Sequence, residues 1–144
     1  MAKEIERKFL IHEQKINLYE YDSIEIIQGY LSKDYNPTIR IRISGSIAFL
    51  TVKGPNDGIT RSEFEYHIPV TDAEEMLKLC HGQIISKTRF SVEGWEVDMF
   101  HRHNEGLIIA EIELDSVDAE FDKPDWIGEE VSDNKKYYNI NLIG

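Results

Sequence analysis

The sequence contains a single cysteine, Cys80, and few basic residues for its number of acids. One cysteine can form neither an intrachain disulfide nor a cysteine-based zinc site. The 16 lysines and arginines stand against 27 aspartates and glutamates, which gives a formal net charge of −11. Phosphate backbones and anionic membrane surfaces would repel so acidic a chain, so neither nucleic acid nor a membrane is an expected partner.

Long hydrophobic runs are also missing. No apolar run approaches the roughly 20 residues of a membrane-spanning helix, and no signal peptide precedes the charged first residues. These absences lead us to expect a cytoplasmic protein. With 144 residues, of which 41% are hydrophobic and 30% charged, the chain is expected to fold as one domain over residues 1–144.

Alternation of apolar and polar residues predicts a structure made mainly of strands. The predicted strands cover residues 3–11, 24–33, 37–44, 47–54, 60–69, 84–92, 95–101 and 106–115. Short turns separate most of them, which favours antiparallel hairpins, and eight strands are enough to close a barrel. One helix is predicted from Thr71, which forms a capping box with Glu74, to near Gly82. A second helical stretch is predicted at about 15–21 and a short turn at 117–121.

Charged residues recur along these strands at a spacing of two, which places their side chains on one face of a strand. The acids are Glu4, Glu6, Glu63, Glu65, Glu111 and Glu113 in pairs, with Asp98 alone on its strand. The bases are Arg40, Arg42, Lys87 and Arg89 in pairs, with Lys8 and Lys53 single. Each pair therefore has one sign.

This sorting is compatible with two arrangements of the sheet. In the first, the charged faces meet solvent in cross-strand ion pairs, as is usual for half-buried strands. A solvent-exposed ladder is expected to mix signs along each strand, however, whereas every pair here is like-sign. We therefore favour a closed barrel whose charged face lines a water-filled tunnel with a basic and an acidic sector. Such a tunnel would suit a polyanion bridged by metal ions.

Other features have simpler explanations. His101 and His103 have strand spacing, but no third soft ligand lies near them in sequence, and we expect them at a hairpin tip. No Gly-Lys-Ser/Thr follows the segment 54–58, so we expect a hairpin turn there and not a phosphate-binding loop. Trp95 and Trp126 are expected to pack between the barrel wall and its covering helices.

Several motifs occur in the order seen in a known family. They are Glu4-x-Glu6-x-Lys8, Gln28-Gly29-Tyr30-Leu31, Arg40-Ile41-Arg42, Val52-Lys53-Gly54, Arg61-x-Glu63-x-Glu65, Lys87-Thr88-Arg89-Phe90, Trp95-Glu96-Val97-Asp98, Glu111-Ile112-Glu113-Leu114 and Tyr137-x-Asn139. Together they resemble the CYTH superfamily, the triphosphate tunnel metalloenzymes, over essentially the whole chain. The resemblance implies an all-β-dominated α+β fold: an eight-stranded antiparallel closed β-barrel with a few covering helices. One departure is Lys136, where the family commonly has arginine.

The resemblance and the strand parity together assign roles to the charged residues. Positive side chains should grip the phosphate oxygens, and these are Lys8, Arg40, Arg42, Lys53, Lys87 and Arg89. Carboxylate oxygens select Mg²⁺ or Mn²⁺. The first choice of metal ligands is Glu4, Glu6, Glu111 and Glu113, with Asp98, Glu63 and Glu65 as further ligands or as holders of metal-bound water. In resembling enzymes Tyr30 would contact Lys8, so the expected catalytic set is Lys8, Tyr30, Asp98, Glu111 and Glu113.

The resemblance implies a divalent-metal-dependent hydrolase that cleaves inorganic triphosphate to pyrophosphate and phosphate. The alternatives are a class IV adenylate cyclase or a thiamine or nucleoside triphosphatase of the same superfamily, or a non-catalytic polyphosphate-binding module. The presence of an acidic sector beside the basic one favours an enzyme over a binding module, because simple polyanion binding needs only the bases. The sequence leaves open the physiological substrate, the preferred metal, the group that activates water, any contact of Lys136 with substrate, and whether the chain forms a homodimer.

Overall fold

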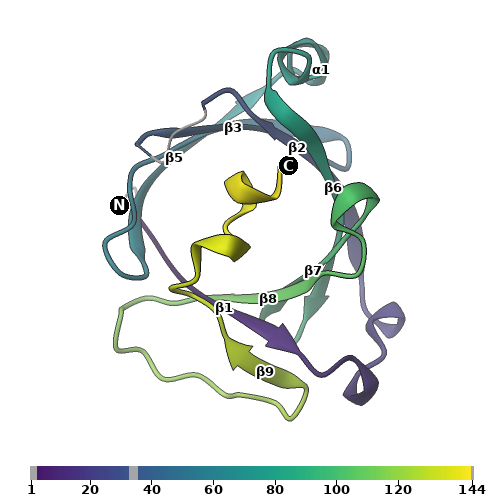
Figure 1. Ribbon diagram of the computed structural model, residues 1–144, viewed down its shortest axis with the longest axis vertical. Coiled ribbons are helices and arrows are strands. Elements are labelled where there is room, and N and C mark those ends of the chain that lie inside the picture. Colours follow the sequence, from purple (N-terminus) through teal and green to yellow (C-terminus); the bar gives the residue numbers. More distant parts are fainter. Residues whose placement is uncertain (1–2, 33–35, 144) are drawn as a thin grey trace.

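The computed structural model describes residues 3–32 and 36–143. Its main feature is a closed antiparallel barrel of eight strands, seen end-on in Figure 1. The strands are β1 (Lys3–Ile11), β2 (Ser23–Tyr30), β3 (Thr38–Ser44), β4 (Ile47–Lys53), β5 (Thr60–Ile68), β6 (His81–Val92), β7 (Trp95–Phe100) and β8 (Ile108–Glu113). Their order around the barrel is β5-β4-β3-β2-β6-β7-β8-β1, and pairing of β1 with β5 closes the ring. The predicted closed barrel is confirmed.

All eight predicted strands are present, with differences at their ends. β6 begins at His81, ahead of the predicted start at residue 84, because His81 pairs with Tyr30 of β2. The predicted end of the second strand, at residue 33, lies outside the described residues. A ninth strand, β9 (Ile127–Glu130), was not predicted and pairs with β1 at Phe9 and Ile11. It is too short to show an alternating pattern.

Glycine residues occupy the hairpin turns, where the backbone requires a positive φ. Gly45 connects β3 to β4 with a φ of 60°, and Gly94 connects β6 to β7 with a φ of 90°. Such positive φ values match the right-handed twist of the flanking strands, and glycine adopts them without a steric penalty. The predicted antiparallel hairpins are therefore confirmed at both turns.

The helix α1 (Val70–Leu77) is shorter than predicted. Its N-cap residue is Pro69, with an extended backbone and no side-chain cap, so the predicted capping box of Thr71 and Glu74 is wrong. Thr71 lies one residue inside the helix, where its own backbone is already helical. The helix ends well before Gly82, because the chain must enter β6 at His81.

Short 3₁₀ helices occupy the connections. Two of them, η1 (Glu13–Lys15) and η2 (Leu18–Glu20), replace the helical stretch predicted at 15–21, because Ile16 between them is extended. A third, η3 (Arg102–Asn104), joins β7 to β8. In the part of the chain that the structure describes, no helix has the length and apolar character needed to cross a membrane.

Two apolar clusters lie outside the barrel wall, because their strand residues alternate with those that face the interior. One contains Trp95 and Trp126, whose ring centroids are 5.9 Å apart, together with Leu18 of η2. The expectation that both tryptophans pack between the wall and its cover is confirmed. The other cluster joins Ile41 of β3 to Ala73 of α1, so the helix packs against the outer face of the sheet.

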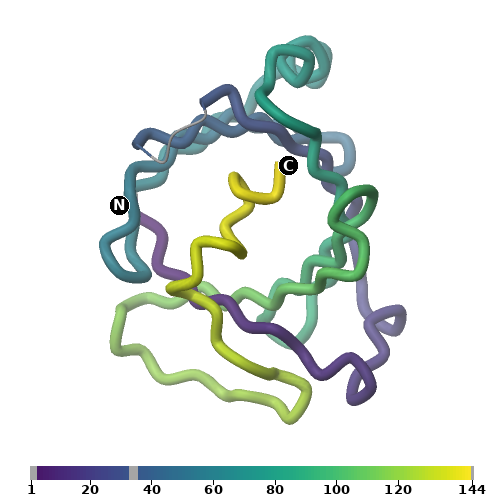
Figure 2. Tube along the Cα trace, in the orientation of Figure 1, coloured from purple at the N-terminus to yellow at the C-terminus, as the bar shows by residue number. Residues whose placement is uncertain are grey.

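The third apolar cluster lies inside the barrel and was not predicted. Two further 3₁₀ helices, η4 (Lys135–Tyr137) and η5 (Asn139–Leu142), run within the ring of strands as the yellow segment in Figures 1 and 2. Ile140 and Leu142 pack there against strand residues that include Ile85 and Ile109. The interior of the barrel is thus charged over part of its length and apolar where the C-terminal segment fills it.

Candidate active site

The charged part of the interior surrounds a cavity of about 200 Å³. Its charged lining residues are Glu4, Glu6, Glu63, Glu65, Glu96, Glu111 and Glu113, with Lys8, Arg40, Arg42, Lys53, Arg61, Lys87 and Arg89. All six predicted bases are among them, and so are all the predicted acids except Asp98. Arg61 and Glu96 were not predicted. Each lies two residues from a predicted site residue, Glu63 and Asp98, so strand parity could have indicated both.

The strand order separates the charges by sign around the barrel. The neighbouring strands β4, β3, β2 and β6 carry Lys53, Arg40, Arg42, Lys87 and Arg89. The neighbouring strands β7, β8, β1 and β5 carry the carboxylates. The predicted basic and acidic sectors are confirmed, with Lys8 and Arg61 as the two cations within the acidic sector.

Three carboxylates of the acidic sector come together. Oxygens of Glu4, Glu6 and Glu113 all lie within 4.8 Å of one another. Burial and the charges of Glu111 and Glu4 hold the pKa of Glu6 well above its usual range. Burial and the charges of Glu4 and Glu63 also raise the pKa of Glu113. Among the described residues Glu113 forms no ion pair, so this group holds negative charge that a cation would relieve.

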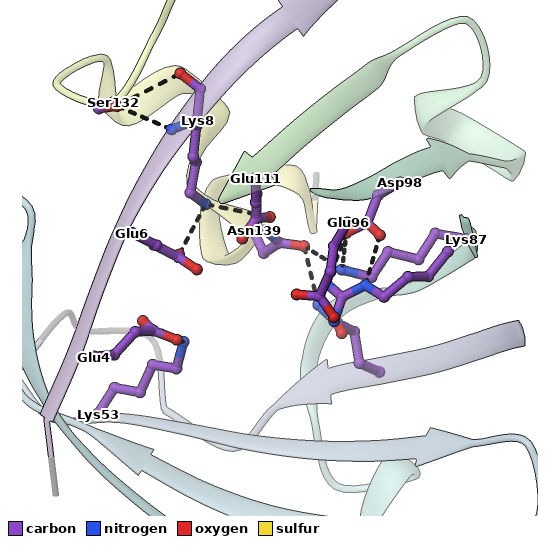
Figure 3. A network of polar contacts seen from close by, with 12 residues as sticks. Glu4, Glu6, Lys8, Lys53, Lys87, Glu96, Asp98, Glu111, Ser132 and Asn139 are labelled. Carbon is purple, nitrogen blue, oxygen red and sulfur yellow. Dashed lines mark hydrogen bonds and ion pairs between the residues drawn. The ribbon is translucent and has the colours of Figure 1, made fainter. Parts of the chain in front are cut away.

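Glu4 differs from the other two because a lysine already contacts it. Lys53 Nζ lies 2.9 Å from Glu4 Oε1 and 3.0 Å from Oε2. Figure 3 shows this pair beside Glu6. Lys53 therefore stands at the boundary between the two sectors.

Lys8 lies between Glu6 and Glu111, with Nζ 4.0 Å from an oxygen of each (Figure 3). Burial alone would lower the pKa of the Lys8 ammonium, but the charges of Glu111 and Glu6 raise it above its ordinary value. Burial alone would raise the pKa of Glu111, but Lys8 and Arg89 bring it well below its usual range. The structure thus places Glu111 against a lysine and groups the other three first-choice ligands together.

The contact expected between Tyr30 and Lys8 is electrostatic in this structure, because Tyr30 is one of the groups that raise the pKa of Lys8, after Glu111 and Glu6. Tyr30 lines the cavity, and its hydroxyl accepts a hydrogen bond from Gln28 Nε2 at 3.4 Å. No hydrogen bond joins Tyr30 to Lys8 in the described ranges. Both side chains still face the same cavity.

Asp98 is fully buried and does not line the cavity. Its Oδ2 accepts from Lys87 Nζ at 2.8 Å and Arg89 Nη2 at 2.9 Å, and its Oδ1 accepts from Arg89 Nε at 2.8 Å. Burial would raise the pKa of Asp98, but these two cations lower it below its ordinary value. In this structure Asp98 therefore holds two bases, and its expected role as a metal ligand stays a prediction.

The basic sector is short of negative charge. Burial, with the charges of Arg40 and Arg89, lowers the pKa of Arg42 to about 9. Arg40 Nε is buried and has no hydrogen-bond partner among the described residues, although Arg40 Nη2 contacts Glu65 at 3.3 Å. Glu63 contacts Lys53 at 3.4 Å. The two glutamates of β5 thus pair with bases, and an anion in the cavity would meet the donors that remain.

Replacing Asp98 with asparagine should strongly destabilise the fold. Lys87 and Arg89 would lose their shared carboxylate, and removing one partner of a buried ion pair costs about 3–5 kcal/mol. Urea unfolding at neutral pH measures this change in the free energy of unfolding. The control is Glu96→Gln, which removes a half-exposed partner of Arg89 and should cost less than about 1 kcal/mol. Equal costs for the two variants would contradict the role assigned to Asp98.

The contribution of Asp98 to the stability of the fold should decrease as the pH falls. Because the pKa of Asp98 is lower in the folded state, its stabilising effect is present above the ordinary carboxylate pKa. It is lost as pH falls through the folded-state pKa. The difference in unfolding free energy between wild type and Asp98→Asn should therefore shrink as the solution is acidified.

The remaining sequence expectations have clear outcomes. His101 and His103 lie at the β7–β8 connection, where their ring nitrogens contact Thr88 Oγ1 at 2.7 Å and Leu142 O at 2.6 Å. The segment 54–58 connects β4 to β5 as a hairpin. Lys136 is exposed and does not line the cavity.

Five polar residues of the lining had no site role assigned from the sequence, although Asn139 belongs to the motif Tyr137-x-Asn139: Thr38, Asn56, Ser132, Tyr138 and Asn139. Ser132 Oγ accepts from the backbone N–H of Lys8 at 2.9 Å. Asn139 lies on η5, and its side chain reaches the basic sector (Figure 3). Ser132 and Asn139 lie in no alternating pattern, so strand parity did not indicate that they face the cavity, and for Asn139 the sequence signal was its place in the quoted motif.

Two features together characterise this protein: a closed antiparallel barrel, and an internal cavity divided into a cationic and an anionic sector. The chain belongs to the CYTH domain family, whose model matches residues 2–141. It is 45% identical to the inorganic triphosphatase of Acetivibrio thermocellus over 99% of this chain and 94% of that protein. It is 36% identical to the inorganic triphosphatase of Nitrosomonas europaea over 96% of this chain and 95% of that protein.

A solved structure agrees with these sequence matches. The crystal structure of an inorganic triphosphatase superposes with a TM-score of 0.70 at 34% identity. The match covers 99% of this chain and 95% of the other. The agreement therefore extends over the whole barrel and includes the strands that carry the charged sectors.

Proposed function

We propose that this protein is a divalent-metal-dependent inorganic triphosphatase that cleaves triphosphate to pyrophosphate and phosphate. The observation that carries the proposal is the cavity, in which a sector of five bases faces a group of three crowded carboxylates. The two relatives named above, both inorganic triphosphatases, support the same activity.

The bases would hold the substrate. Cleavage of a phosphoanhydride needs a positioned phosphate chain and neutralisation of the oxygens where charge develops. Arg40 and Arg42 of β3 offer planar guanidinium donors, and Lys53 of β4 and Lys87 of β6 add amine groups. Burial, with the charges of Arg40 and Arg89, lowers the pKa of Arg42, and a bound polyanion would oppose this lowering.

The carboxylate group fits a small divalent cation. Glu4, Glu6 and Glu113 offer hard oxygen donors, and burial together with neighbouring carboxylates raises the pKa values of Glu6 and Glu113, which a bound cation would oppose. We infer that these three residues would hold Mg²⁺ or Mn²⁺, with Glu111 nearby. When bound, such an ion neutralises charge on phosphate oxygens and lowers the pKa of a coordinated water. Lys8 is placed to contact an oxygen of the substrate from the acidic side.

The cavity favours an inorganic substrate over a nucleotide. Its volume of about 200 Å³ is below the roughly 300–1,000 Å³ typical of pockets for drug-sized organic ligands. The aliphatic residues in its lining are Ile59 and Ile140. A nucleoside needs an apolar slot for its base, and two aliphatic residues in a strongly charged lining provide little apolar surface for one.

Phosphate release across a substrate panel tests the proposal. With Mg²⁺ or Mn²⁺ present, we expect kcat/KM for inorganic triphosphate to exceed that for ATP by at least about tenfold, because a missing base pocket removes binding energy from the nucleotide. The panel also includes GTP, thiamine triphosphate, pyrophosphate and long-chain polyphosphate. Higher kcat/KM for an organic triphosphate, or cyclic AMP as the main product from ATP, would contradict the proposed substrate. Binding of triphosphate without turnover would instead indicate a polyphosphate-binding module.

A further inference from the structure

The C-terminal segment contributes a polar side chain to the middle of the basic sector. Asn139 Oδ1 accepts hydrogen bonds from Gln28 Nε2 at 3.1 Å and from Lys87 Nζ at 3.2 Å. Gln28 and Lys87 are almost completely buried, so water does not compete effectively for these bonds. Asn139 is the first residue of η5, whose Ile140 and Leu142 are fixed in the apolar cluster inside the barrel.

The hydrogen bond between Asn139 and Lys87 restricts the orientation of the Lys87 ammonium. A lysine ammonium has three N–H donors. One contacts Asp98 Oδ2 at 2.8 Å and a second contacts Asn139 Oδ1. Two fixed directions determine the third, so these two bonds fix the orientation of the whole ammonium group at the wall of the cavity.

The hydrogen bond between Asn139 and Gln28 restricts the guanidinium of Arg42, because Gln28 also contacts Arg42. Gln28 Oε1 accepts from Arg42 Nε at 2.9 Å, so the amide that Asn139 holds is also the partner of Arg42. With Nε engaged, the two terminal nitrogens of Arg42 remain for a ligand and their plane is set. One oxygen of Asn139 thus connects two bases that lie on the different strands β6 and β3.

The chemical type of residue 139 also matters. Asparagine supplies an acceptor oxygen without a negative charge. A carboxylate at this place would accept the same bonds but would cancel part of the positive charge that should bind a polyanion. The basic sector already contains one buried carboxylate, Asp98, which Lys87 and Arg89 share.

We propose that Asn139 is a positioning residue of the triphosphate site, which orients Lys87 directly and Arg42 through Gln28. This inference rests on the proposed function. It makes the C-terminal segment a part of the site as well as a filling of the barrel. The mechanism does not need Asn139 to touch the reacting atoms.

Two variants separate a positioning role from a packing role. Asn139→Leu keeps the number and branching of the side-chain heavy atoms beside an apolar cluster but removes the acceptor. We expect its kcat for triphosphate to fall about tenfold or more, since small displacements of positioning groups cost rates of this order. Asn139→Asp keeps the acceptor and adds charge, so kcat should stay within a few-fold of wild type while KM rises about tenfold through like-charge repulsion. A residue needed only for packing would show the reverse order, with Leu tolerated and Asp damaging.

The control variant is Asn141→Leu. Asn141 lies on the same η5 helix, does not line the cavity, and donates from Nδ2 to the backbone oxygen of Lys135 at 2.6 Å. It should keep kcat and KM close to wild type. Melting temperatures of all variants identify any that fail to fold. If Asn139→Leu does not fold, the Asn139→Asp variant decides alone, and an unchanged KM for it would overturn the inference.

Binding measured without turnover separates this inference from the proposed function. Titration calorimetry with tripolyphosphate in a chelator gives Kd for wild type and Asn139→Leu, and we expect about tenfold weaker binding by the variant, the size of one lost charge-assisted hydrogen bond. If wild type binds tripolyphosphate but does not hydrolyse it with metal present, the proposed function fails while the comparison of Kd still tests Asn139. If wild type is active and Asn139→Leu keeps both kcat and Kd within twofold, the positioning role is refuted.

Discussion

Removal of divalent cations by a chelator is expected to abolish triphosphate hydrolysis by this protein, and excess Mg²⁺ or Mn²⁺ should restore it. Glu4, Glu6 and Glu113 crowd their oxygens within 4.8 Å of one another, and no ion pair of Glu113 exists among the described residues. Without a cation, this group repels an anionic substrate instead of helping to neutralise it. Phosphate release measured before and after metal addition checks the expectation.

The control for chelation is the stability of the fold. The barrel is held by strand pairing and by three apolar clusters, so the melting temperature in the chelator should stay high enough for the protein to remain folded during the assay. Full turnover in the chelator by a folded protein would refute the metal assignment. Loss of activity together with unfolding would show that the cation holds the structure, which the proposal does not require.

Glu113→Gln should lower kcat for triphosphate by roughly a hundredfold or more, the effect expected when a group that stabilises transition-state charge is lost. The substitution keeps the size of the side chain and removes its charge. It should not destabilise the fold, because burial and like-charge crowding raise the pKa of Glu113 in the folded protein. Steady-state kinetics at saturating Mg²⁺, together with the melting temperature, measure both effects.

The matched control is Glu129→Gln on β9, an exposed residue outside the cavity lining. The same loss of one negative charge there should leave kcat unchanged. A Glu113→Gln variant with kcat near that of Glu129→Gln would mean that Glu113 is only a polar residue of the barrel wall. In that case Glu4 and Glu6 would need a different partner for the cation.

Strand parity made most of the candidate site predictable. Arg40 and Arg42 face the cavity because residues two apart on a strand share a face, and the like-sign pairing indicated a closed barrel. The same rule applied to every position would have found Arg61 and Glu96. Parity gives the face of a residue, however, and not its neighbours.

Asp98 illustrates what parity could not determine. It has the same parity as Glu96 and points to the interior, yet Lys87 and Arg89 of the adjacent strand β6 surround both of its oxygens. Burial and partners depend on which strands are adjacent and at what register. That information is absent from the local pattern of a single strand.

The C-terminal segment illustrates a second limit. The residues 135–143 have no alternating or helical periodicity, because 3₁₀ turns are short and their contacts are with distant strands. Ile140 and Leu142 fill the apolar end of the barrel, and Asn139 reaches the basic sector. Nothing within the segment specifies this placement, because it depends on the space that the closed barrel leaves inside.

The sequence by itself determined the strands, their antiparallel hairpins and the inward face with its two signs of charge, because these follow from side-chain alternation and turn chemistry over a few residues. The tertiary structure decided which carboxylates crowd together, which charges neutralise each other as Lys87 and Asp98 do, and where Asn139 lies. These features depend on distances between strands and segments that are far apart in the chain. Closing the barrel fixes those distances, and only then does a row of alternating charges become a site.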